Sequence, residues 1–559
     1  MVARKDTVYY SSDWADKTLG EKFSVGGLNL TFGVDAFANA ENVKQTAKAG
    51  ATIIAYGTQQ EMDIKAGISD AKITGVSAIY AEGADVNFKN IDASSTTVFS
   101  GGKATETAED KTISYENASV KRIYAGALYD DVKQEGAGAT ITATVKDTEA
   151  KLAGIFGGGE VLKGSNTILA NTSLTVEDIT ATILSGGNYI DKGISNDEIV
   201  ETIVNGNIKT NLTDVNVANF FIGSDAINVY DVVKRTGDIN LSVDGGSVTT
   251  LMGGCYLQSS ATVDTSTTPP TIIRIGSEST GNINIEIGGD AIVSNIYGAG
   301  GCKVVSASKT IWDDERLAED SGITHNGNVN ITIDVSQGAK VTSTVAAGSF
   351  GWGVVDGNTT ITVKGSGKSD SFGTSTSLLT GDSTMRGDGG TSDTFVDGTK
   401  TLNVSNFNGK INGFIGYFDT INIENSSVNF DWKNINPLTN VTTSDEVMNW
   451  KLSSATKEQA AFTCNADDWA VSFAGRNLEF NCADLAEAGD EWTCFSSAFE
   501  SIEDFADIGS GSLLVNGSAF NLGDYDEDEM SYTSSDGLYQ VKLSSSEEDG
   551  DKIIVSKLA

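Results

Sequence analysis

Proline is nearly absent from this sequence of 559 residues, in which only three occur. A single histidine, His325, excludes a histidine-rich zinc site and leaves one candidate for a catalytic triad. No run of about 18 apolar residues is present, so we expect no insertion into a membrane. The sequence has 38 basic and 76 acidic residues, which gives a formal charge of −38. This charge argues against nucleic acid as a partner.

Cysteine is scarce as well, and five widely spaced residues do not suit a disulfide scaffold or a zinc ribbon. They are Cys255, Cys302, Cys464, Cys482 and Cys494. Cys255 and Cys302 each follow a Gly-Gly pair, so on neighbouring strands they would form either a disulfide or a buried thiol pair. His325 precedes Asn-Gly, a sequence typical of a solvated loop.

Glycine is abundant, with 62 residues, and much of it recurs in one motif. An apolar residue precedes a large apolar or aromatic one, and small residues including glycine follow. Copies are Val98-Phe99-Ser100-Gly101-Gly102, Ile123-Tyr124-Ala125-Gly126, Ile155-Phe156-Gly157-Gly158, Ile183-Leu184-Ser185-Gly186-Gly187, Leu251-Met252-Gly253-Gly254 and Ile296-Tyr297-Gly298-Ala299. The irregular intervals between copies indicate a repeat with insertions.

A second repeated element alternates apolar and polar residues with a period of two. It occurs at residues 237–244, 281–288 and 327–334. In the first copy Ile239, Leu241 and Val243 share one face, so each copy predicts a half-buried strand. Stacking would bring Asn240, Asn284 and Asn330 into an amide ladder on the outer face.

These repeats predict an all-β fold, a right-handed parallel β-helix (solenoid), because one such coil cannot bury its apolar face alone. We expect an N-terminal strand and helix cap in residues 1–60, with a capping helix over 36–48 and Asp35 as its N-cap. The solenoid would occupy residues 61–436. The repeated motifs are not found in the sequence after Pro437, which predicts a linker at 437–445 and a small β-rich C-terminal module at 446–559.

The repeat units resemble those of bacterial autotransporter-like and adhesin-like surface proteins with parallel β-helix repeats. The likeness rests on units such as residues 281–301 and on the opening at residues 8–14 and 32–37, and it covers roughly residues 7–436. It implies a secreted or cell-surface protein with a structural or adhesive role and no enzymatic activity. Its partners would be further copies of itself, forming a homo-oligomer, layer or filament, or a host glycan or protein receptor.

The main alternative is a polysaccharide lyase or glycoside hydrolase of parallel β-helix type. Asp244, Glu286 and Asp334 occupy outward positions on successive inferred coils, where two carboxylates could flank a sugar. The strand elements themselves carry no basic residues to accompany them. We therefore expect a solvated acidic face and no enzyme activity.

Two further motifs suggest binding. Asp524, Asp526, Asp528 and Glu529 are spaced as at the start of a calcium loop, although glycine is missing from its sixth position. The segment is either a calcium site, which would make calcium the one cofactor, or an acidic turn. Arg386-Gly387-Asp388 is an integrin-type tripeptide.

Overall fold

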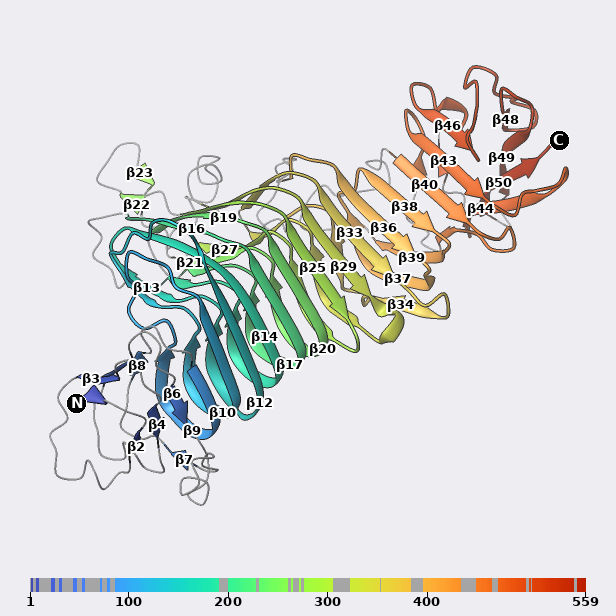
Figure 1. Cartoon of the computed structure of the whole chain (residues 1–559). Coiled ribbons are helices and arrows are strands. Elements are labelled where there is room, and N and C mark those ends of the chain that lie inside the picture. Colours follow the sequence, from blue (N-terminus) through green and yellow to red (C-terminus); the bar gives the residue numbers. More distant parts are fainter. Residues whose placement is uncertain are drawn as a thin grey trace. The chain divides into compact units, whose positions relative to one another are not determined.

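A computed structural model describes the chain in short strands up to residue 80 and then almost continuously (Figure 1). The later described ranges are 86–190, 200–227, 231–259, 263–264, 271–272, 276–304, 322–351, 353–383, 396–433, 449–464, 471–498, 502–503, 505–546 and 550–559. These residues contain strands and short 3-10 turns but no α-helix, which confirms the predicted all-β class. Among them, no helix has the length and apolar character needed to cross a membrane.

The chain divides into two compact units. The first comprises residues 1–285, 299–327 and 352–354, and the second comprises residues 286–298, 328–351 and 355–559. Strand β25 (Ile283–Gly288) begins in the first unit and ends in the second. Each unit is described separately below.

Long parallel strands dominate the first unit. Each pairs with the next in a single ladder: β9 (Val86–Phe99), β10 (Lys111–Tyr124), β12 (Ala139–Phe156), β14 (Asn166–Ser185), β17 (Ile208–Ile222) and β20 (Ile239–Met252). The six strands are visible side by side in Figure 1. Five of the predicted glycine motifs mark the ends of β9, β10, β12, β14 and β20. The motif therefore stops a strand and turns the chain.

Two ladders of shorter parallel strands accompany the long one in the first unit. The first joins β11 (Leu128–Asp130), β13 (Glu160–Lys163), β15 (Tyr189–Ile190), β18 (Ala226–Ile227), β21 (Cys255–Ser259) and β27 (Gly300–Val304). The second begins at residues 166–169 of β14 and joins β16 (Val200–Asn205), β19 (Asp231–Thr236), β24 (Gly276–Thr280) and β28 (Gly322–Asn326). A separate two-stranded antiparallel pair is formed by β22 (Val263–Asp264) and β23 (Thr271–Ile272).

Alternation along the strands separates core from surface as predicted. Ile239, Leu241 and Val243 are each at most 3% exposed, while Asn240 and Asp244 between and after them are exposed. Asn284 donates to the Asn240 side chain at 3.0 Å, so the expected amide ladder is confirmed for this pair. Asn330 lies in the second unit, opposite Thr360.

The second unit contains two further parallel ladders. One joins β29 (Val329–Asp334), β33 (Thr359–Lys364), β36 (Lys400–Ser405), β38 (Thr420–Glu424), β40 (Asn449–Ser454), β43 (Asn477–Cys482) and β46 (Ser512–Val515). The other joins β26 (Ile292–Tyr297), β30 (Lys340–Ala346), β35 (Leu378–Thr380), β37 (Asn408–Gly416), β39 (Ser427–Lys433), β41 (Phe462–Cys464) and β44 (Glu491–Ser497).

Parallel pairing continues past Pro437, where the sequence suggested that the repeat ends. Strand β40 pairs in parallel with β38, and β41 with β39. Among the described residues of the second unit, the antiparallel pairs lie near the C-terminus. Strand β46 pairs with β47 (Ser518–Ala519), and β48 (Ser531–Thr533), β49 (Tyr539–Ser546) and β50 (Gly550–Lys557) form a meander against β44. The described residues at the C-terminal end are therefore rich in strands, while the boundary of a separate module at residue 446 stays a prediction. The proposed linker at 437–445 lies outside the described residues.

The prediction of an N-terminal helix was wrong for the part of it that the structure describes. Residues 44–47 of the predicted helix form strand β5 (Lys44–Ala47), which pairs in parallel with β3 (Lys22–Val25). Helix propensity is a weak preference that pairing with a neighbouring strand can override. Asp35 and the start of the predicted helix lie outside the described residues. The same pairing continues in β4 (Leu30–Phe32) with β6 (Ile53–Ala55).

Candidate functional site

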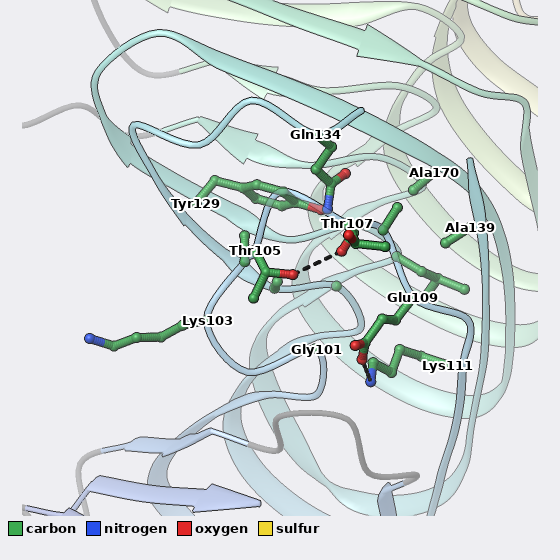
Figure 2. Close-up of a pocket in the computed structure, with 15 residues that line it drawn as sticks. Gly101, Lys103, Thr105, Thr107, Glu109, Lys111, Tyr129, Gln134, Ala139 and Ala170 are labelled. Atoms are coloured by element: carbon green, nitrogen blue, oxygen red, sulfur yellow. Dashed lines mark hydrogen bonds and ion pairs between the residues drawn. The ribbon is translucent and has the colours of Figure 1, made fainter. Parts of the chain in front are cut away.

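A pocket of about 380 Å³ lies in the first unit, among the loop before β10 and the strands β10, β11, β12 and β14 (Figure 2). Its lining combines small residues with a few polar side chains. The residues that carry its chemistry are Lys111, Glu109, Tyr129 and Gln134. A volume near the lower end of the range for small-molecule sites, roughly 300 to 1,000 Å³, suits a ligand of modest size.

Lys111 is the unusual member of the pocket lining. It is 7% exposed and occupies a core-facing position at the start of β10, opposite Ile141 of β12. Ile141 lies opposite Thr172, and Thr172 lies opposite Ile208, so neighbouring strands carry uncharged residues at this position. The Lys111 Nζ atom is 3.1 Å from Glu109 Oε2, and the Glu109 side chain is 52% exposed.

Two neutral polar side chains complete the site. Tyr129 is 2% exposed, and burial raises the pKa of its hydroxyl, which therefore stays protonated. Gln134 is 7% exposed, and its Oε1 atom accepts a hydrogen bond of 2.9 Å from the Leu169 amide. Figure 2 shows these two side chains on one side of the pocket and the Lys111 and Glu109 pair on the other.

A second polar cluster is buried in the core of the same unit. The Arg235 Nε atom donates to Asp225 Oδ2 at 2.8 Å, and both side chains are at most 1% exposed. The backbone and side-chain nitrogens of Asn188 donate to Asp225 Oδ1 at 2.8 and 2.9 Å. Burial opposes ionisation of the carboxyl, but Arg235 and Asn188 hold the pKa of Asp225 below its ordinary value. These contacts satisfy an ion pair that has no access to solvent.

The single histidine of the sequence also lies in this buried region. The prediction that it is a solvated loop residue was wrong. His325 lies in β28 and is 1% exposed, and its Nδ1 atom is 2.8 Å from the Ser279 hydroxyl. Ser279 is opposite Arg235 on β19, so the three side chains occupy one position on successive strands. Sequence reasoning placed His325 in a loop before the strand, because Asn-Gly suggested a turn, but β28 continues to Asn326 and the chain bends at Gly327.

Cys255 is a free, fully buried thiol that donates to the Ser224 hydroxyl at 3.4 Å. Burial raises the pKa of this thiol, with a further contribution from the Asp225 carboxylate. The strands of Cys255 and Cys302 are neighbours, as the thiol-pair hypothesis required, but Cys255 lies opposite Gly300 and Cys302 opposite Leu257. Cys255 is therefore not part of a disulfide.

The three acidic residues considered for a lyase or hydrolase, Asp244, Glu286 and Asp334, are divided between the two units. Asp244 is an exposed residue of the first unit, opposite Thr213. Glu286 and Asp334 belong to the second unit, where Asp334 accepts a hydrogen bond of 2.9 Å from the Ser336 amide. Asp334 thus caps the short 3-10 turn Val335–Gln337.

The candidate calcium residues form an exposed turn in the second unit. Asp526 Oδ1 accepts from the amides of Asp528 and Glu529 at 3.0 and 3.1 Å, while Asp524 pairs with the Asn521 amide group. Glu529 accepts from Gln540 at 3.0 Å. Within the described ranges, no three His, Cys, Asp or Glu side chains are grouped so that they could hold a metal ion. Calcium binding at Asp524, Asp526, Asp528 and Glu529 stays a prediction.

Sequence reasoning missed Lys111, Tyr129, Gln134 and the Asp225–Arg235 pair. One signal was available: Lys111 alternates with Ile113 and Tyr115, which places it on the core face. The tripeptide Arg386 to Asp388 lies outside the described residues. Comparison with protein-family models and with curated proteins found no match to this sequence.

Proposed function

We propose that the chain is a right-handed parallel β-solenoid that acts as a non-catalytic structural or adhesive scaffold outside the cell or on its surface. The observation that carries the proposal is the order in which strands join the ladders of the first unit. Strands β17, β18 and β19 each enter a different ladder, and β20, β21 and β24 repeat the same order. A chain that winds in successive coils produces this order. Crossovers between parallel strands are right-handed in about 98% of cases, which supports the handedness.

The surface of the coils also supports a scaffold. Many outward positions on the long strands are Thr, Ser or Asn, and some of these side chains hydrogen-bond to the neighbouring strand, as Ser247 does to Asn216 Oδ1 at 2.7 Å. The Asn284 to Asn240 bond is one example, and the Asn422 side chain donates to Asn403 at 2.8 Å in the second unit. Such ladders stiffen a stack of strands without creating a reactive group.

The adhesin-like character of the repeats is the basis for the proposed location and partners. Surface proteins of this kind display an extended solenoid to other copies of themselves or to a host glycan or protein. The excess of acidic residues suits contact with cations and with neutral surfaces better than contact with anionic ones.

Incubation with polymeric substrates separates the scaffold from the lyase or hydrolase alternative. We expect the purified chain to release no unsaturated or reducing sugars from pectin or alginate, because the strands that carry Asp244, Glu286 and Asp334 contain no basic residues to bind an acidic polysaccharide. Absorbance at the wavelength of unsaturated uronates and a reducing-sugar assay provide the measurement. Sugar release that is lost in the Asp244→Asn variant would identify an enzyme instead.

A further inference from the structure

The pocket in the first unit contains a charged residue that folding alone does not require. Lys111 occupies a position that neighbouring strands fill with Ile141, Thr172 and Ile208. Burying an ammonium group is unfavourable, and its partner Glu109 is half exposed to water. An apolar side chain at position 111 would extend the row of core residues. The lysine is therefore explained better by a ligand than by packing.

Unused hydrogen-bonding groups face the same pocket. In the described part of the chain, neither the Tyr129 hydroxyl nor the Gln134 Nε2 atom forms a hydrogen bond to another protein group, and neither is among the fully buried polar atoms without a partner. Both atoms are therefore open to the pocket, where a ligand or water can accept a hydrogen bond from them. Together with the Lys111 ammonium group, they present three donors to a ligand that supplies oxygen acceptors.

The remaining walls select for small apolar groups. Ala127, Ala139 and Ala170 line the pocket beside Ile141 and the aromatic ring of Tyr129. Alanines leave space for a methyl group, and the faces of aromatic rings pack against apolar surfaces. A neutral ligand also suits a chain with a formal charge of −38 better than an anionic one.

We propose that this pocket binds a 2-acetamido sugar, such as the terminal residue of a glycan. The acetamido carbonyl would accept from Lys111 or Gln134, the acetamido methyl would pack among the alanines, and a sugar hydroxyl would accept from Tyr129. This inference does not depend on the scaffold proposal. A scaffold without a sugar site would neither bind the acetamido sugars nor release sugars from pectin or alginate, whereas an enzyme with this site would do both.

The test uses the full chain and four free sugars. N-acetylglucosamine and N-acetylgalactosamine are compared with glucose and galactose, which lack the acetamido group, by saturation-transfer NMR and isothermal titration calorimetry. We expect saturable binding of at least one acetamido sugar, with the matching hexose at least tenfold weaker. Lys111→Met should weaken binding by about tenfold or more, since it removes a charged donor. Tyr129→Phe should weaken it by about threefold.

Lys121→Met is the matched control, because Lys121 is an exposed lysine of the same strand β10. It should leave sugar binding unchanged, and the thermal midpoint of each variant reports whether it folds. If Lys111→Met fails to fold, Tyr129→Phe still tests the site, since it removes only one hydroxyl. Absence of binding by both acetamido sugars, equal binding of the hexoses, or equal losses in Lys121→Met and Lys111→Met would overturn the proposal.

Discussion

Two charged side chains in the core of the first unit, Asp225 and Arg235, are each held by several partners. Asp225 receives hydrogen bonds from Arg235 and Asn188, and the Arg235 Nη1 atom donates to the Gly206 carbonyl at 2.9 Å. Burial opposes the charged form of both groups, but their mutual attraction raises the pKa of Arg235 and lowers that of Asp225. Removing one partner would leave the other charge buried and alone.

Asp225→Asn is expected to lower the free energy of unfolding by about 3–5 kcal/mol, because it leaves the Arg235 guanidinium uncompensated. The double variant with Asp225→Leu and Arg235→Met should recover most of this loss, since apolar side chains can replace a buried ion pair. Urea unfolding followed by circular dichroism measures both.

The control is Glu201→Gln, which removes the exposed partner of Lys234 at 2.8 Å on the neighbouring strands β16 and β19. Exposed ion pairs contribute about 0–1 kcal/mol, so this variant should unfold almost as the unchanged chain does. A cost for Asp225→Asn no larger than that of Glu201→Gln would show that the buried pair does not stabilise the core.

At the scale of elements, the turns that enter the long strands are built on stacked glycines. Gly237 and Gly281 have φ values of 135° and 128°, and each lies over the backbone of the preceding turn. The residue after each glycine links the same turns: Asn207 Oδ1 accepts from the Asp238 amide at 2.9 Å, and Asp238 Oδ1 accepts from the Asn282 amide at 2.8 Å. The repeated Gly-Asn and Gly-Asp pairs are thus explained by the close approach of successive turns.

Gly237→Ala should destabilise the first unit by about 3 kcal/mol, because the new Cβ atom would overlap the Gly206 carbonyl and the backbone conformation is restricted to glycine. The change in thermal midpoint measures the effect. Gly288→Ala is the control, since no atom lies within 4 Å of the added Cβ atom. Equal midpoints for the two variants would contradict the stacked-turn explanation.

Strands were predictable from sequence wherever alternation was strict. The alternation of Ile239, Leu241 and Val243 with polar residues predicts β20 from the local sequence alone. The β5 strand and the parallel pairing after Pro437 were missed because contact with a distant strand, and not a local pattern, stabilises them. Local propensity cannot reveal such pairing.

The candidate site depends on register, which the sequence does not contain. Alternation places Lys111 on the core face, but only the pairing with Ile141 shows that it stands in a row of otherwise uncharged residues. Tyr129 of β11 and Gln134 of the following loop line the same pocket as Lys111. The acidic turn shows the converse: the regular spacing of Asp524, Asp526 and Asp528 predicted converging carboxylates, whereas the Asp526 carboxylate accepts from the backbone amides of residues 528 and 529.

At the scale of the whole molecule, the formal charge of −38 governs association between copies. Like charges oppose the close approach of two copies. Salt screens this repulsion, so that at 0.1 M ionic strength exposed charges more than about 10 Å apart hardly repel each other. Divalent cations can also bridge carboxylates of two chains. A scaffold with this surface should therefore assemble more readily as sodium chloride or calcium is added.

Electron microscopy of the negatively stained chain, across a series of sodium chloride and calcium concentrations, tests the scaffold proposal most directly. We predict ordered layers or filaments that become more extensive as either salt is raised, with calcium effective at lower concentrations than sodium. Dispersed single particles under every condition would contradict a self-assembling scaffold. Assemblies that dissolve when cations are added would contradict the electrostatic explanation of how the copies associate.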